Sequence, residues 1–99
     1  MRGVTKALEF WPEYEGGPLW TEQGASVDLD ELGLPVGLED RVVAWSRLYA
    51  DDKLPMDGPG DERWLDDGRR VLAELREALQ GRYEIVVTEP WWGDEAPAR

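Results

Sequence analysis

The segment DDKLPMDGPGDERW, which begins at Asp51, combines carboxylates and glycines in a way that could bind a metal ion. A calcium-binding EF-hand loop needs acidic or amide side chains at positions 1, 3 and 5, glycine at position 6 and glutamate at position 12. A count from Asp51 puts Glu62 at position 12. Lys53, Pro55 and Met56 then occupy positions 3, 5 and 6, so two ligands and the turn glycine are missing. We therefore expect no metal site in this segment.

The same segment carries the signals of a connector between two helices. Pro55 disfavours the helical conformation of the residue before it and so is expected to stop the first helix. Gly58, Pro59 and Gly60 favour turns, and Asp61 is a good N-cap for a second helix. The sequence thus predicts two helices joined by a loop.

The rest of the chain offers little for catalysis. It has no histidine and no cysteine, which excludes a Ser-His-Asp triad, a Cys-His pair and a zinc site built on those ligands. The glycines of the connector lack the lysine and the spacing of a phosphate-binding loop. Pairs of carboxylates are abundant, as glycosidases require, but so small a domain leaves little room for a sugar cleft. The sequence predicts no enzyme, no catalytic residue, no cofactor and no metal; a small enzyme or carbohydrate binder that uses carboxylates and tryptophans is the third alternative.

Charge is the strongest overall feature of these 99 residues. The net charge is −11, which disfavours nucleic acids and anionic membranes as partners and favours a protein with a basic surface. Nine acidic residues and no basic residue lie between Ala7 and Asp40, whereas nine of the eleven basic residues lie at or after Arg41. Such asymmetry indicates an acidic working face, and improved solubility is the alternative explanation.

Compartment and membrane signals point to a cytoplasmic protein. No run approaches the 18 apolar residues of a membrane-spanning helix, and the first residues lack the long apolar core of a signal peptide. The absence of cysteine agrees with a reducing compartment.

Aromatic residues fall into two groups. Trp45 and Trp64 lie on the apolar stripes of the predicted helices and are expected in the core, whereas four further tryptophans lie outside the helices among acidic neighbours. Tryptophan and tyrosine are favoured as anchors of protein interfaces; covering the second face of a sheet is the alternative role. The predicted partner-binding residues are Trp11, Glu13, Tyr14, Glu15, Trp20, Glu22, Asp28, Asp30 and Glu31.

Strand patterns appear at both ends of the chain. The side chains of residues 5–11 are expected to alternate between the two faces of a strand, with Leu8 and Phe10 on one face. Turn residues at 16–18 lead into a short second strand at 18–22, which would make a hairpin with the first. Residues 82–90 form a third strand, with Ile85 on its apolar face.

Two helical patterns lie between the second and third strands. Residues 36–53 carry apolar side chains at helical spacing, with Pro35 near the first turn. The second helix begins after Asp61 and ends near Gly81; its stripe is formed by Leu65, Gly68, Leu72, Leu75 and Leu79. Because glycine destabilises a helix by about 1 kcal/mol against alanine, we expect a large ring or a backbone to approach Gly68 closely.

The order β-β-α-α-β predicts a small α+β domain in which both helices pack on one face of a small sheet. This order allows the third strand to join the first in parallel or the second in antiparallel. The domain is expected to span residues 1–90, followed by a partly disordered tail at 91–99 in which Trp91 and Trp92 either pack back or stay exposed. No pattern indicates an oligomeric state.

Several short motifs resemble small acidic bacterial proteins of unknown activity, some of which are similar to immunity proteins encoded beside polymorphic or contact-dependent toxins. The likeness covers residues 8–92 and rests on PLW at 18–20, Gly24, LGLP at 32–35, Leu38, Trp45, Tyr49 and YEIVV at 83–87. Many relatives have serine in place of Pro35, which makes the start of the first helix less certain here. The resemblance implies a toxin-neutralising immunity function. Because the shared motifs are packing patterns, it assigns no binding residue.

Together, the sequence predicts a cytoplasmic, non-enzymatic domain that binds a basic partner protein, such as a toxin domain, through an acidic surface studded with aromatic residues. The second alternative is an acidic regulatory or accessory domain of a larger assembly.

Overall fold

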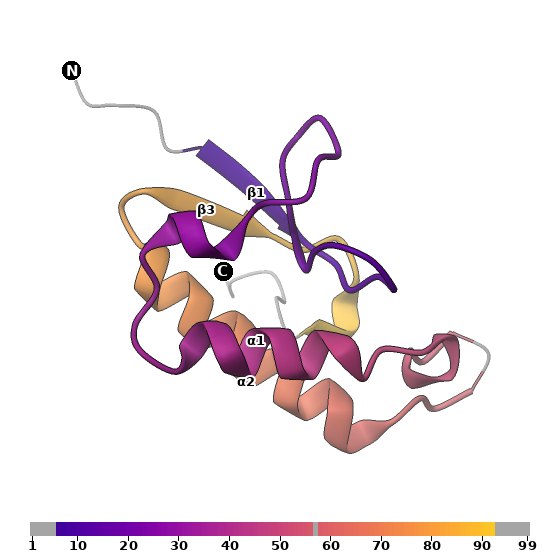
Figure 1. Cartoon of the computed structure of the whole chain (residues 1–99). Helices are drawn as coiled ribbons and strands as arrows, with labels where there is room; N and C mark the ends of the chain where they lie inside the picture. Colours follow the sequence, from indigo (N-terminus) through magenta and orange to yellow (C-terminus); the bar gives the residue numbers. More distant parts are fainter. Residues whose placement is uncertain (1–5, 57, 93–99) are drawn as a thin grey trace, which may run out of the picture.

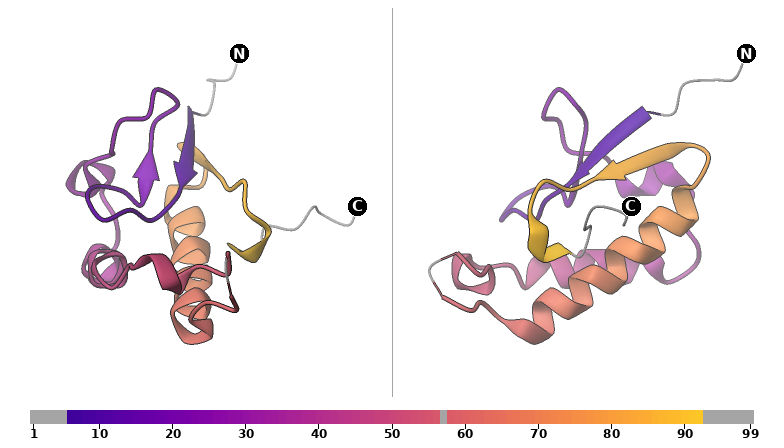
Figure 2. Two further views of the ribbon diagram at one scale, coloured as in Figure 1. Left: turned by 90° about the vertical axis from the view of Figure 1, so that its right-hand side faces the viewer. Right: turned by 180° about the vertical axis from the view of Figure 1, so that it is seen from behind.

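The computed structural model describes residues 6–56 and 58–92 and has the predicted α+β architecture. Two helices lie on one face of a three-stranded sheet (Figures 1 and 2). In chain order the elements are β1 (Lys6–Phe10), β2 (Leu19–Trp20), α1 (Leu38–Arg47), α2 (Glu62–Leu79) and β3 (Tyr83–Val86), with short 3-10 helices η1 (Leu29–Leu32), η2 (Asp51–Lys53) and η3 (Pro90–Trp92).

The sheet has the order β2-β1-β3. β1 pairs with β2 in antiparallel, as expected for the predicted hairpin, and Glu9 lies opposite Trp20. Of the two positions that the sequence allows for the last strand, β3 takes the parallel one beside β1, with Ile85 opposite Leu8. Leu8, Phe10 and Ile85 are buried, as the alternation of each strand predicts.

The first helix is shorter than the predicted span of residues 36–53. α1 begins at Leu38, and its N-cap is Gly37, whose φ of 86° favours glycine. Pro35 therefore lies two residues before the N-cap, near the first turn but outside the helix. The helix ends at Arg47, and Ala50 is extended before the separate turn η2.

The connector explains this early end. Leu54 is buried, and a continued helix could not turn its side chain into the core. Because α1 already ends at Arg47, the prediction that Pro55 ends the first helix is wrong. Asp61 N–H donates to the carbonyl of Lys53 over 3.0 Å, and the two side chains form an ion pair at the same distance. The connector thus closes on itself.

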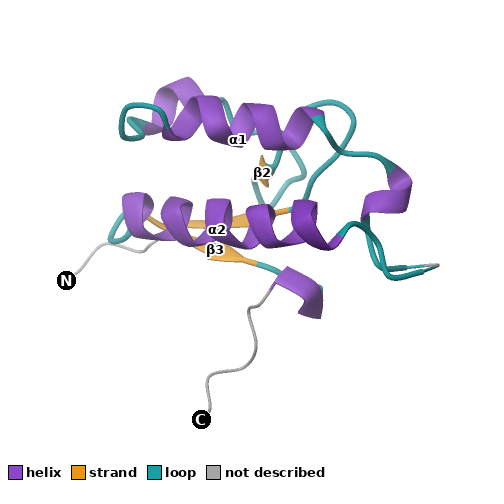
Figure 3. Ribbon diagram, turned by 90° about the horizontal axis from the view of Figure 1, so that it is seen from below, coloured by secondary structure: helices purple, strands orange, loops and turns teal. Residues whose placement is uncertain are grey.

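The second helix agrees closely with its pattern. Asp61 is the N-cap, and its Oδ1 accepts the N–H of Trp64 over 3.0 Å. Leu72 and Leu75 are buried as predicted, and α2 packs against α1 (Figure 3). Gly81 follows the helix with a φ of 88°. None of the helices in the described residues is long and apolar enough to cross a membrane.

A cluster of aromatic rings fills the core between the helices and the sheet. Trp45 and Trp64 stack with ring centroids 4.4 Å apart, and each indole N–H donates to the other residue's carbonyl. Phe10 stacks on Trp45 and meets the edge of Trp92. A Cβ on Gly68 would lie 2.5 Å from Cζ2 of Trp45. This confirms the expectation that a large ring approaches Gly68.

Trp92 is 1% exposed and belongs to this core. Trp91 is half-buried, and its carbonyl accepts Nε–H of Arg69 over 2.8 Å. The first residues of the predicted tail therefore pack against α2. The remainder of that tail, residues 93–99, lies outside the described residues.

Candidate protein-binding site

Five of the nine predicted partner-binding residues line one open surface groove beside the β1–β2 hairpin. We call it the hairpin groove, and it is lined by Trp11, Glu13, Tyr14, Glu15, Trp20, Glu9, Gly24 and Glu89. Three of these residues are aromatic, four are glutamates and none is lysine or arginine.

The hairpin is built around Trp20. Gly16 and Gly17 turn the chain with φ values of 78° and 70°, and a Cβ on Gly17 would lie 2.9 Å from the indole of Trp20. Gly17 N–H donates to Oγ of Ser26 over 2.8 Å. The ring of Trp20 therefore lies tightly against a turn that only glycines can form without strain.

Hydrogen bonds fix both indoles of the groove. Nε1 of Trp20 donates to the carbonyl of Trp11 over 2.7 Å, and Nε1 of Trp11 donates to Oε2 of Glu13 over 3.0 Å. Both rings are partly exposed. Because their orientation is set before any partner arrives, binding to them costs little side-chain entropy.

Tyr14 joins the groove to the helices. Tyr14 is 65% exposed. Its ring and that of Tyr49 pack edge to face, with ring centroids 4.8 Å apart. The hydroxyl oxygen accepts the backbone N–H of Asp51 over 3.1 Å. Burial, the negative charge of Asp51 and a hydrogen bond to its carboxylate raise the pKa of Tyr49, so the hydroxyl of Tyr49 stays protonated at physiological pH.

The carboxylates of the groove differ from those near the helices. Glu9, Glu13, Glu15 and Glu89 form no ion pair with any described residue. By contrast, four carboxylates of α2 and its N-cap are paired: Asp61 with Lys53, Asp66 with Arg69 and Arg70, Asp67 with Arg70, and Glu74 with Arg41. The groove thus presents negative charge that no cation within residues 6–56 and 58–92 neutralises through an ion pair.

Sequence reasoning missed two glutamates of the groove. Strand alternation places Glu9 on the face opposite Leu8 and Phe10, so a signal for it was present. Glu89 lies far from the hairpin in sequence. It reaches the groove because β3 runs parallel to β1, a pairing that the sequence left open.

The other four predicted residues lie elsewhere. Glu22, Asp28 and Glu31 line a second pocket, which also contains Lys6. Asp28 is the N-cap of η1, where its Oδ1 accepts the N–H of Asp30 over 3.0 Å.

Asp30 lines neither of these two pockets. A hydrogen bond between its carboxyl group and that of Glu39 raises the pKa of Glu39, and burial and nearby negative charges add to this effect. Among the described residues, no group of three acidic side chains could hold a metal ion.

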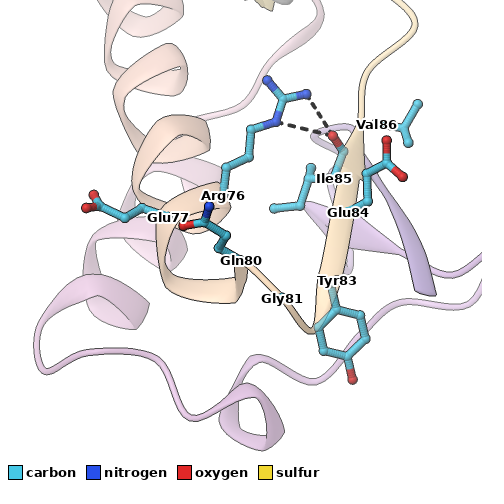
Figure 4. Close-up of a pocket in the computed structure, with 8 residues that line it drawn as sticks. All are labelled: Arg76, Glu77, Gln80, Gly81, Tyr83, Glu84, Ile85 and Val86. Atoms are coloured by element: carbon cyan, nitrogen blue, oxygen red, sulfur yellow. Dashed lines mark hydrogen bonds between the residues drawn. The ribbon is translucent and has the colours of Figure 1, made fainter. Parts of the chain in front are cut away.

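A further pocket, between the end of α2 and the edge of β3, is shown in Figure 4. Nη2 and Nε of Arg76 donate to the carbonyl of Ile85 over 2.7 and 3.2 Å. This arginine therefore ties the edge strand to the helix, and we assign it a structural role.

Comparison with known proteins agrees with the resemblance in the sequence. No curated protein matches the chain. Residues 6–90, which include both helices, all three strands and every residue that lines the hairpin groove, match the Serratia CdiI immunity protein-like family. The chain belongs to the Serratia CdiI immunity protein-like family.

Proposed function

We propose that this chain is an immunity protein that neutralises a toxin by binding it through the hairpin groove. The family supports the general role. The observation that carries the specific site is the groove itself, where three aromatic rings lie among four glutamates that form no ion pair with a described residue, and no lysine or arginine of the described part of the chain lines it. The partner surface that complements such a groove is basic.

Binding would proceed in two stages. The negative charge of the groove, within a chain of net charge −11, attracts a basic surface over a distance and speeds encounter. The rings of Trp11, Trp20 and Tyr14 then make close contact. Two of these rings are held by hydrogen bonds and the third by its hydroxyl group, so little order has to be gained on binding.

Neutralisation then needs no catalytic step, because a bound immunity protein blocks the toxin surface that it covers. The chain contains no histidine or cysteine nucleophile, in keeping with a binding function. We place the protein in the cytoplasm, where a chain without cysteine loses nothing to the reducing conditions.

The test is growth rescue. Candidate toxin domains encoded by genes that neighbour this one are expressed under an inducible promoter, alone or with the chain. We expect the wild-type chain to restore growth and the double variant Glu13→Lys, Glu15→Lys to fail. The control is Glu77→Lys, which reverses an exposed charge on α2 outside the groove and should protect fully. Full protection by a folded double variant would show that the groove is not the binding site.

A further inference from the structure

We infer that the hairpin groove is a receptor for a guanidinium group, so that the partner inserts an arginine side chain into it. This inference deepens the proposed function, on which the identity of the partner rests. The contact itself is a property of the groove and can be tested without the partner.

The first argument concerns the two indoles. Both N–H groups are already used, by the carbonyl of Trp11 and by the carboxylate of Glu13. The indoles therefore cannot donate hydrogen bonds to a ligand and offer it only their ring surfaces. The face of an indole attracts a cation through the ring quadrupole, most strongly for tryptophan.

The second argument concerns hydrogen bonding at the rim. Glu9, Glu13 and Glu15 are exposed and are acceptors when ionised, and none forms an ion pair with a described residue. Glu89 adds negative charge, but its Oε1 is buried and its Oε2 already accepts the hydroxyl of Thr88 over 2.6 Å. Oε2 of Glu13 is held by Trp11, while Oε1 makes no hydrogen bond with a described residue. A ligand of this groove must therefore bring hydrogen-bond donors and positive charge, which excludes anions and disfavours neutral groups.

The third argument separates arginine from lysine. A guanidinium is planar, is weakly hydrated, stacks on aromatic faces and presents five donors in a fork that matches carboxylates. An ammonium is a compact and strongly hydrated charge. A site that combines flat ring surfaces with several carboxylates satisfies both properties of the guanidinium, whereas an ammonium gains chiefly from the charge.

The experiment uses three acetylated and amidated tripeptides, Gly-Arg-Gly, Gly-Lys-Gly and Gly-citrulline-Gly. Each is titrated into the ¹⁵N-labelled full chain while the indole N–H signals are followed by NMR. Trp11→Phe and Trp20→Phe variants assign the two signals of the groove. We expect the arginine peptide to shift both signals and to bind roughly three-fold or more tightly than the lysine peptide. The uncharged citrulline peptide should leave them in place.

Three results would overturn the inference: no shift of the Trp11 and Trp20 signals with the arginine peptide, equal affinity for the lysine peptide, or equal shifts with citrulline. Glu13→Gln with Glu15→Gln should weaken arginine binding, whereas the control Glu77→Gln should not.

The two proposals can fail separately. If toxin protection depends on Glu13 and Glu15 but no peptide shifts the indole signals, the guanidinium receptor is wrong and the immunity site stands. If the arginine peptide binds in the groove but the groove variants protect fully, the receptor stands and the proposed toxin-binding site is wrong.

Discussion

Tryptophans of the core and of the hairpin groove form the same type of hydrogen bond, from the indole N–H to a backbone carbonyl, but their rings have different surroundings. In the core, Nε1 of Trp45 donates to the carbonyl of Trp64 over 2.8 Å. In the groove, Nε1 of Trp20 donates to the carbonyl of Trp11 over 2.7 Å. The ring faces differ, because that of Trp45 packs against other rings whereas that of Trp20 is partly exposed among unpaired glutamates. The comparison teaches that a fixed indole can support the fold or a ligand, depending on what its face meets.

Replacing one tryptophan from each region should give the largest contrast. Trp45→Ala removes a buried ring from the centre of the aromatic cluster and should lower the free energy of unfolding by about 3–5 kcal/mol. Trp20→Ala removes a partly exposed ring and should cost less than about 2 kcal/mol. Urea denaturation of both variants measures the difference. Equal losses would mean that Trp20 is a structural residue and would remove the contrast between the two regions.

The fit of the core around Gly68 gives the next largest effect. Gly68→Ala should improve helix propensity by about 1 kcal/mol, but the new Cβ would lie 2.5 Å from Trp45. We expect overpacking to outweigh the gain, with a net loss of about 1–3 kcal/mol in urea denaturation. Gly58→Ala is the control, because a Cβ there meets nothing within 4 Å. A stabilised Gly68→Ala variant would show that the ring cluster adapts readily.

Sequence patterns predicted the parts of the molecule that local rules determine. The leucine spacing and the cap at Asp61 are properties of a single helix, and the structure confirms them. The close approach at Gly68 is a contact with Trp45 of α1, but a glycine on the apolar stripe of the helix was a local signal for it. The early end of α1 and the burial of Trp92 depend instead on contacts with distant segments. The groove was half predictable, because its hairpin residues are neighbours in sequence whereas Glu89 arrives through the pairing of β3 with β1.

The carboxylates of the groove also differ from those near α2 that form ion pairs, and Asp61 represents the paired carboxylates. Its hydrogen bond from Trp64 and its contact with Lys53 lower its pKa. A carboxylate with a lowered pKa stabilises the fold above its unfolded pKa of about 4, and this stability is lost as the pH falls through the folded pKa. Asp61→Ala should therefore lower Tm at pH 7 by less than Gly68→Ala does, and the difference from wild type should shrink in acid. A constant difference across pH would show that the charge plays no part.

Glu39 lies in the acidic segment between Ala7 and Asp40 and represents the carboxyl groups that form no ion pair with a described residue. Its replacement should give the smallest effect. The hydrogen bond to Asp30, burial and neighbouring carboxylates raise its pKa. A carboxyl group with a raised pKa stabilises the fold below its unfolded pKa, and this contribution is lost as the pH rises through the folded pKa. Glu39→Gln removes the charge and should slightly raise Tm at pH 7, with no gain in acid. A lower Tm at pH 7 would mean that the carboxylate makes a favourable contact.

The most direct test of the hairpin groove as the binding site is the association rate with the toxin domain that growth rescue identifies. Stopped-flow measurements compare wild type with Glu13→Lys, Glu15→Lys from about 0.01 M to 1 M salt, a range over which the screening length falls from about 30 to 3 Å. We predict that the double variant associates about ten-fold or more slowly at low salt and depends less on salt, while Glu77→Lys changes much less. If the double variant associates as fast as wild type at every salt concentration, the hairpin groove is not the surface that recognises the partner.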